Sequence, residues 1–301
     1  MMRTHVVEAA ENLAYALMEE NAALAVLDLK RAGALVAGKQ RAVAAFATAL
    51  AETSLDDAGR SLARRLLRRA PADVDLCPLY GPLIAPSASA DGCYVIGRIA
   101  QSLDGYIATA TGASQWISGP DDIVHTHRLR ALFDAVVIGA GTIRADDPQL
   151  TTREVEGPSP VRVVLDTERR LDARYRVFND GPETLLCCAA DAAVGDRVGA
   201  AEVVRLPRAA KGLDIAAVLA ALADRGLRRI FVEGGGITVS RFLVAEALDR
   251  LHVTIAPMLM GSGIPAFTLP RVASLADVPR FGWSVYRIGV DVLVDIPLKR
   301  A

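Results

Sequence analysis

The stretch that decides the fold is Gln101–Arg153, which reads QSLDGYIATATGASQWISGPDDIVHTHRLRALFDAVVIGAGTIRADDPQLTTR. It contains apolar runs such as Ala135–Ile138, and clusters of Gly, Ser, Thr, Asp and Arg follow them. In an α/β protein, polar residues at the ends of buried strands surround the crevice in which a nucleotide and a polar substrate bind. The stretch therefore favours an α/β fold with a site for phosphorylated ligands.

Short apolar runs alternate with helical segments to the end of the chain. The predicted strands are Tyr94–Ala100, Ala135–Ile138, Val161–Leu165, Thr184–Cys188, Val203–Leu206, Ile230–Val232, Leu251–Ala256 and Val290–Ile296. The predicted helices are Asp121–Leu132, Ile215–Asp224 and Val239–Ala247. This alternation is typical of a mostly parallel sheet with helices on both faces. We expect the last strand and the run Leu251–Met258 to pair antiparallel at an edge.

The beginning of the chain has a different composition. Residues 1–70 are rich in Ala, Leu, Glu and Arg, with apolar residues at helical spacing, so we expect a small all-α N-terminal region. Residues 71–92 carry prolines and a Ser/Ala-rich stretch, which predict a linker. Residues 93–301 then form the α/β domain.

Composition and charge argue against several classes of protein. The formal net charge of −1 leaves no basic surplus, so we expect no nucleic-acid partner. The sequence has neither a run of eighteen apolar residues nor a leader-like N-terminus, so we expect no membrane span and a cytoplasmic location. Cys77, Cys93, Cys187 and Cys188 form no Cys-x-x-Cys pair, and we expect reduced thiols.

Two glycine-rich turns follow predicted strands. In Phe231–Arg241, FVEGGGITVSR, Glu233 ends a buried strand, and three glycines then lead into a helix. Glycines let a backbone approach a diphosphate, and the N–H groups of a helix start favour an anion. Gly139–Thr142 is a second such turn, and Asp146 follows it. Neither turn matches G-x-G-x-x-G or a P-loop, so a ligand-free turn stays an alternative interpretation of each.

Taken together, these segments resemble the reductase domain of the bifunctional riboflavin-biosynthesis deaminase–reductase family. The matching blocks are SLDG (102–105), GASQWIS (112–118), RLRALFDAVVIGAGTIRADDPQLTTR (128–153), PVRVVLDTERR (160–170), FVEGGGITVSRFL (231–243) and IAPMLMGSGIPAF (255–267). The resemblance implies a dihydrofolate-reductase-like α/β fold, with a mostly parallel central sheet flanked by helices. It also implies an NADPH-dependent reductase that converts 5-amino-6-(5-phosphoribosylamino)uracil to the ribitylamino product.

The resemblance assigns roles to individual residues. The NADPH contacts fall on Ala100, Trp116, Thr142, Asp146, Thr167, Gly235, Gly236, Ile237, Thr238, Val239, Ser240 and Arg241. The contacts to a phosphorylated heterocyclic substrate fall on Ser114, Arg130, Leu150, Arg153 and Glu233. Glu233 and Asp146 are the candidates for a catalytic role.

Side-chain chemistry agrees with several of these roles. Arg130 and Arg153 can each hold a phosphate bidentately, although surface arginines are the alternative interpretation. Trp116 is either a flat wall for a ligand or a core residue. Arg169 and Arg170, together with Thr167, could meet the 2′-phosphate that distinguishes NADPH from NADH. A homodimer is the default expectation.

The histidines have no motif that would place a catalytic imidazole. His125 and His127 lie two residues apart on a predicted helix. We expect both of them on the helix surface.

The chain departs from the family pattern in two places. The H-x-E and P-C-x-x-C signatures of a zinc deaminase are absent, so we expect neither deaminase activity nor a metal site. Tyr106 stands where many members carry Lys or Arg, which leaves a dihydrofolate- or pterin-type reductase as an alternative. The helical N-terminal region motivates a third interpretation, a non-catalytic nucleotide-sensing interaction protein.

Overall fold

The computed structural model describes residues 79–80, 82–83, 89, 91–192 and 195–298. The chain divides into two compact units, Met1–Pro86 and Ser87–Ala301. The predicted all-α region, 1–70, and most of the predicted linker, 71–92, lie outside the described residues. The account that follows concerns the second unit.

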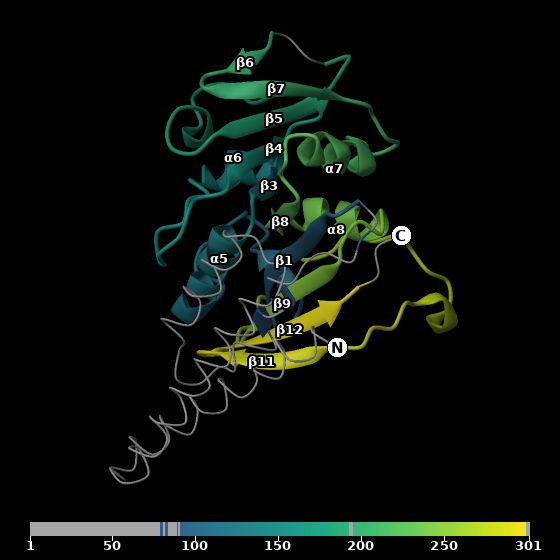
Figure 1. The fold of residues 1–301 in the computed structure, drawn as a ribbon. Coiled ribbons are helices and arrows are strands. Elements are labelled where there is room, and N and C mark those ends of the chain that lie inside the picture. Colours follow the sequence, from purple (N-terminus) through teal and green to yellow (C-terminus); the bar gives the residue numbers. More distant parts are fainter. Residues whose placement is uncertain (1–78, 81, 84–88, 90, 193–194, 299–301) are drawn as a thin grey trace, which may run out of the picture. The chain divides into compact units, whose positions relative to one another are not determined.

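A ten-stranded sheet runs through this unit in the order β11-β12-β9-β1-β8-β3-β4-β5-β7-β6 (Figure 1). The strands are β1 (Tyr94–Ser102), β3 (Ala135–Gly139), β4 (Val161–Leu165), β5 (Thr184–Ala189), β6 (Arg197–Val198), β7 (Ala201–Leu206), β8 (Arg229–Glu233), β9 (Arg250–Ala256), β11 (Ser284–Ile288) and β12 (Asp291–Pro297). All neighbours from β9 to β7 pair in parallel. The outer strands β12, β11 and β6 pair antiparallel. The predicted α/β class and the antiparallel pairing of the last strand are therefore confirmed. The last strand, β12, does not form the edge, because β11 pairs outside it.

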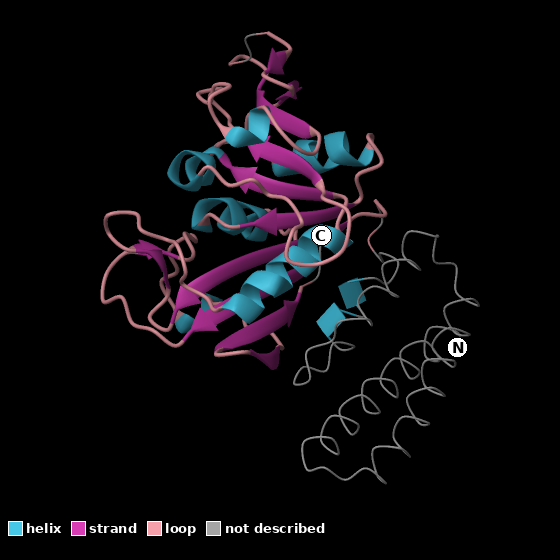
Figure 2. Ribbon diagram, turned by 90° about the vertical axis from the view of Figure 1, so that its left-hand side faces the viewer, coloured by secondary structure: helices cyan, strands magenta, loops and turns pink. Residues whose placement is uncertain are grey.

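Helices cover both faces of the sheet (Figure 2). They are α5 (Pro120–Leu132), α6 (Ala140–Asp146), α7 (Ile215–Ala223) and α8 (Gly236–Val244), with short 3₁₀ turns at Arg176–Phe178 and Leu275–Asp277. On one face Val218 of α7 and Phe242 of α8 join the main apolar core of the sheet. On the other face Phe133, at the end of α5, packs against Phe231. Because both faces are covered, the parallel strands are nearly continuous apolar runs.

Several element boundaries differ from the predicted ones. Helix α8 begins at Gly236, inside the glycine-rich turn, and ends at Val244, whereas the pattern predicted Val239–Ala247. Glycine has a low helix propensity, so the sequence alone predicts a turn there. Gly141 and Thr142 in the first turn, together with Gly139 before it, explain in the same way why α6 was not predicted. Strands β2 (Tyr106–Ala108) and β10 (Ile264–Pro265), which pair with each other, are too short for a periodicity argument.

No helix in the described part of the chain has the length and apolar character that a membrane span needs. Within the same residues, no group of three or more His, Cys, Asp or Glu side chains is arranged to hold a metal ion.

Candidate active site

A cavity of about 700 Å³ opens at the carboxyl ends of the central strands. Its walls come from the ends of β1, β3, β4 and β8 and from the first turns of α6 and α8. The carboxyl ends of parallel strands meet at one edge of a sheet. Residues far apart in the sequence, such as Ala100, Thr142 and Glu233, are therefore neighbours around this cavity.

The two glycine-rich turns lie against each other in the cavity wall. Gly234 and Gly235 have φ of 64° and 58°, a region that glycine adopts at little cost. A Cβ on Gly235 would lie 2.7 Å from Oγ1 of Thr142, and a Cβ on Gly236 would lie 2.5 Å from the carbonyl oxygen of Ala266. Only glycine lets these segments approach so closely.

The start of α8 is suited to an anion. Its N-cap, Gly235, has no side chain to accept a hydrogen bond from the first-turn N–H groups. Gly235, Gly236 and Ile237 all line the cavity, with the hydroxyls of Thr142 and Thr238 beside them. Uncapped N–H groups and the positive end of the helix dipole favour a phosphate there. The residues present therefore fit the diphosphate of a dinucleotide.

Most of the residues predicted to bind the cofactor line the cavity. They are Ala100, Trp116, Thr142, Asp146, Thr167, Gly235, Gly236, Ile237, Thr238 and Arg241. Val239 and Ser240 lie elsewhere, because the early start of α8 turns them toward the interior. Val239 is in the apolar core, and the Ser240 hydroxyl accepts a hydrogen bond of 2.8 Å from the backbone N–H of Thr268. Trp116 is 77% exposed and belongs to the cavity wall, so it is not a core residue.

The structure divides the residues predicted to bind the substrate. Ser114 and Glu233 line the cavity, whereas Arg130, Leu150 and Arg153 do not. Leu150 is buried in the core with φ of 57°, and Arg153 is half exposed on the following loop. The backbone position of Leu150, and the direction in which an arginine points, are not encoded in local sequence.

Arg130 is engaged by groups of the protein itself. Its Nε donates a hydrogen bond of 2.8 Å to Oε2 of Glu233, and its Nη2 donates to Oε1. Its Nη1 donates to the carbonyl oxygen of Thr151, 2.9 Å away. Burial by itself would raise the pKa of Glu233, but the Arg130 guanidinium holds that pKa below its ordinary value. Glu233 is therefore an ionised hydrogen-bond acceptor at neutral pH.

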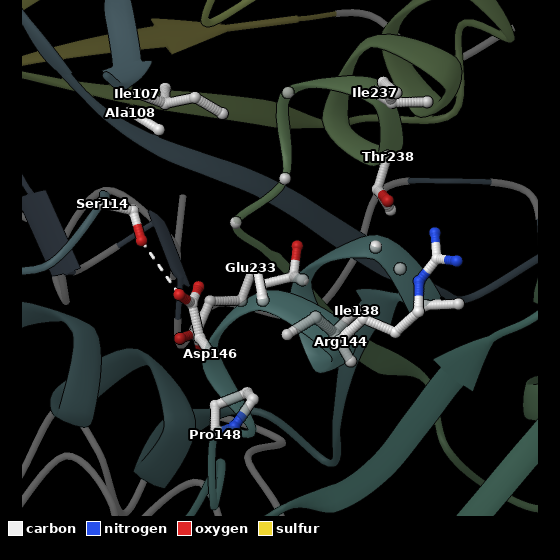
Figure 3. Close-up of a pocket in the computed structure, with 18 of the residues that line it drawn as sticks. Ile107, Ala108, Ser114, Ile138, Arg144, Asp146, Pro148, Glu233, Ile237 and Thr238 are labelled. Atoms are coloured by element: carbon white, nitrogen blue, oxygen red, sulfur yellow. Dashed lines mark hydrogen bonds between the residues drawn. The ribbon is translucent and has the colours of Figure 1, made fainter. Parts of the chain in front are cut away.

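Asp146 and Ser114 form a second polar pair at the cavity (Figure 3). The Ser114 hydroxyl donates a hydrogen bond of 2.9 Å to Oδ1 of Asp146. Asp146 is the last residue of α6, and Ser114 lies in the loop before α5. This bond joins two walls of the cavity, which the spacing in the sequence could not reveal.

Three further arginines line the cavity: Arg98, Arg144 and Arg170. Only Arg170 was named from the sequence, as a possible contact to a 2′-phosphate, and Arg98 and Arg144 were given no role. Arg98 interrupts the predicted strand Tyr94–Ala100, and a charge within a buried apolar run was the signal that could have found it. Arg169, considered together with Arg170, is not part of the wall, because its Nη1 donates to the carbonyl oxygen of Leu171, 2.7 Å away.

The expected surface position of His125 and His127 is wrong. Both are buried, and Nε2 of His125 lies 3.2 Å from Nδ1 of His252. Nδ1 of His127 accepts a hydrogen bond of 3.0 Å from the backbone N–H of Arg153, and burial lowers the pKa of His127 to about 4. The reason is that the sheet face under α5 carries Arg98, Glu233 and His252 beside apolar residues such as Phe231, so polar side chains of the helix also point inward. Tyr106 is not part of the cavity wall, although Ile107 and Ala108 beside it are.

Comparison with known proteins extends this description. Residues 93–285 match the model of the RibD C-terminal domain family. The 2,5-diamino-6-ribosylamino-4(3H)-pyrimidinone 5′-phosphate reductase of Methanothermobacter thermautotrophicus is 37% identical over 217 residues, which cover 68% of this chain and 98% of that protein. The riboflavin biosynthesis protein RibD of Bacillus amyloliquefaciens is 33% identical over 212 residues, covering 68% of this chain and 57% of RibD.

A solved structure has the same fold. The diaminohydroxyphosphoribosylaminopyrimidine deaminase/5-amino-6-(5-phosphoribosylamino)uracil reductase of Thermotoga maritima matches with a TM-score of 0.59 and 28% identity, over 69% of this chain and 57% of that chain. The chain thus spans little more than half the length of the two-activity proteins, but nearly all of the archaeal reductase.

Proposed function

The chain belongs to the RibD C-terminal domain family and is a riboflavin-pathway reductase, and we propose that it uses NADPH to reduce 5-amino-6-(5-phosphoribosylamino)uracil to the ribitylamino product. The observation that carries this proposal is one cavity that combines an uncapped helix start, two closely packed glycine turns and an ionised Glu233. The first two features suit a dinucleotide diphosphate, and the third suits a polar substrate.

Two arginines without an ion-pair partner in the described part of the chain support the binding of a 2′-phosphate. Arg144 and Arg170 line the same cavity as Thr167, and neither forms an ion pair within the described residues. Two free guanidinium groups favour the extra phosphate of NADPH. Arg169 is not a third member of this set, because its guanidinium donates a hydrogen bond to the carbonyl oxygen of Leu171 in its own loop.

The protein's part in the reaction is to bind and orient. NADPH, when bound, supplies a hydride to C1′ of the ring-opened imine, while the imine nitrogen takes up a proton. The α8 start and Thr142 hold the cofactor, and Ser114 with Asp146 closes one side of the cavity. Glu233 accepts a hydrogen bond from the substrate, and because it is ionised it orients rather than donates a proton. Arg153, half exposed, remains our proposed ligand for the substrate phosphate.

The test is a turnover assay that follows the nicotinamide absorbance. We expect NADPH oxidation with 5-amino-6-(5-phosphoribosylamino)uracil, and slower oxidation when NADH replaces NADPH. A parallel arm with 2,5-diamino-6-ribosylamino-4(3H)-pyrimidinone 5′-phosphate asks which pyrimidine is preferred. NADPH oxidation with a dihydropterin but with neither pyrimidine would overturn the proposed substrate. Tight NADPH binding without turnover of any of these compounds would support the interpretation as a nucleotide-sensing protein. The pterin alternative rested on Tyr106, which lies outside the cavity wall.

We also propose that the protein is a cytoplasmic homodimer. The C-terminal part of the described chain, with edge strand β11, exposes several large apolar side chains: Val272, Leu275, Phe281, Trp283, Val285, Val290 and Val292. Exposed apolar residues in such number mark interaction sites in soluble proteins. Light scattering should give twice the chain mass, and a monomer at micromolar concentration would contradict the dimer.

A further inference from the structure

A row of polar side chains crosses the sheet under α5. Arg98 of β1 is paired in register with Glu233 of β8 on one side and with His252 of β9 on the other. Side chains at paired positions of neighbouring strands point to the same face of a sheet. Helix α5 meets each of the three with one side chain: Asp122 for Arg98, Arg130 for Glu233 and His125 for His252.

Arg98 and Glu233 are opposite charges that do not pair with each other. Neighbouring strands lie about 4.8 Å apart, so a cross-strand ion pair between these side chains would be within reach. Both residues line the cavity, with side chains only 8% and 13% exposed. Yet no ion pair within the described residues joins them, because each is held by the opposite charge on α5.

Asp122 is what holds Arg98. It is fully buried, and among the described residues it is the only side chain that accepts a hydrogen bond from the Arg98 guanidinium. Its other oxygen, Oδ1, accepts a hydrogen bond of 2.7 Å from the buried Thr254 hydroxyl. Burial would raise the pKa of Asp122, but Arg98 holds it below its ordinary value, so the pair is ionised. A neutral side chain at position 122 would therefore leave the guanidinium without its ion-pair partner.

We propose that Asp122 is a positioning residue that keeps the Arg98 guanidinium at the cavity wall and prevents it from pairing with Glu233. The guanidinium, a cationic donor, and the Glu233 carboxylate, an anionic acceptor, are then neighbours that can both bind the substrate. The inference rests on the proposed function and deepens it. A heterocycle edge with a carbonyl oxygen next to an N–H, as in a pyrimidinone, supplies the acceptor that Arg98 requires and the donor that Glu233 requires.

The test is a double-mutant cycle of Asp122→Asn and Arg98→Met. Asp122→Asn should lower kcat/KM for 5-amino-6-(5-phosphoribosylamino)uracil by about 10- to 100-fold, the value of a hydrogen bond between charged groups. The Kd for NADPH should stay within about twofold, because the Arg98 end of the cavity serves the substrate. In the Arg98→Met background the same change should cost nothing further. An equal loss in both backgrounds would mean that Asp122 does not act through Arg98, and the proposal would fall.

Asp295→Asn is the matched control. Asp295 is also fully buried and also paired with an arginine, Arg250 of β9. It contacts the far end of the polar row through His252, 3.3 Å away, but it touches neither Arg98 nor the cavity wall. This change should lower the melting temperature and leave kcat/KM unchanged. A loss of kcat/KM as large as that of Asp122→Asn would assign the effect to general loosening of the fold and overturn the proposal. If Asp122→Asn does not fold, Thr254→Val is the second variant. It removes only the hydrogen bond from the Thr254 hydroxyl to Asp122 and should lower kcat/KM by a few-fold.

A crystal structure of Asp122→Asn separates this inference from the proposed function. We expect the Arg98 guanidinium to hydrogen-bond the Glu233 carboxylate in that variant. An unmoved guanidinium would refute the positioning role even if the enzyme is active. If the wild-type protein oxidised no NADPH with either pyrimidine, the proposed function would be refuted. The crystal structure would still show whether Asp122 positions the Arg98 guanidinium.

Discussion

Replacing Arg130 by Met tests the central pair of the site. The change removes two hydrogen bonds to the buried Glu233 carboxylate and one to the carbonyl oxygen of Thr151. Breaking a buried ion pair by removing one partner costs about 3–5 kcal/mol, because the remaining charge is left buried and uncompensated. For a domain of this size, that corresponds to a fall in melting temperature of roughly 6–20 °C.

The pH dependence of this loss follows from the direction of the pKa shift. Because Arg130 holds the pKa of Glu233 below its unfolded value, the pair stabilises the wild type fully above that unfolded value. The stabilisation is lost as the pH falls through the folded pKa. The difference in unfolding free energy between wild type and Arg130→Met should therefore be large at pH 7 and shrink below about pH 4.

The kinetic profile should change as well. Without Arg130 the pKa of Glu233 rises, so the acidic limb of the kcat/KM profile should move to higher pH. Adding Glu233→Gln should restore much of the stability, because no buried charge remains, but not the activity. As a control, Arg162→Met removes another buried arginine that bonds Thr184 and lies outside the cavity wall. It should cost stability without moving the limb.

One result would refute this reasoning. If Arg130→Met weakened substrate binding by the same factor in the wild-type and Glu233→Gln backgrounds, with no shift of the acidic limb, Arg130 would be a direct phosphate ligand. That is the role the sequence had suggested for it.

Three further changes test other parts of the site. Gly235→Ala puts a Cβ 2.7 Å from Oγ1 of Thr142 at a φ of 58°, so the Kd for NADPH measured by fluorescence titration should rise by at least about tenfold; a change under twofold would exclude the diphosphate cradle. Arg144→Ala combined with Arg170→Ala should raise the KM for NADPH by about 10- to 100-fold and leave that for NADH unchanged, and equal rises would contradict the 2′-phosphate assignment. Burial lowers the pKa of His127 to about 4, so the unfolded chain binds more protons between pH 4 and 6.5, and stability should rise over that range. His127→Asn should flatten this rise in urea unfolding, and an unchanged slope would show that His127 does not contribute.

Local sequence predicted the parts of the fold that depend on local pattern. Val161–Leu165 was expected to be a strand and is one with the same boundaries, because a buried parallel strand is an uninterrupted apolar run. Glu233 and the three glycines after it were recognised because a strand end followed by glycines and a helix is a contiguous signal. The short α6 was missed because it has only seven residues and its first turn contains Gly141 and Thr142, which have low helix propensity.

The candidate site was predictable only where the backbone itself forms it. The glycine turns and Thr142 lie at the cavity because their strands end there. Trp116, by contrast, was equally compatible with the core, and its exposure depends on how the loop before α5 is placed. His125 was expected on the surface because no motif gave it a role, and its buried contact with His252 depends on how α5 packs on the sheet.

By itself, the sequence determined the α/β class, the glycine turns and the family, because strand periodicity and motif order are properties of contiguous residues. Only the tertiary structure decided the partners of the charges. Arg130 holds Glu233 from 103 positions away, and Arg98 is held by Asp122 from 24 positions away, once α5 packs on the sheet. A side chain's charge is written in the sequence, but its partner depends on strand register and helix packing, which arise only when distant segments meet.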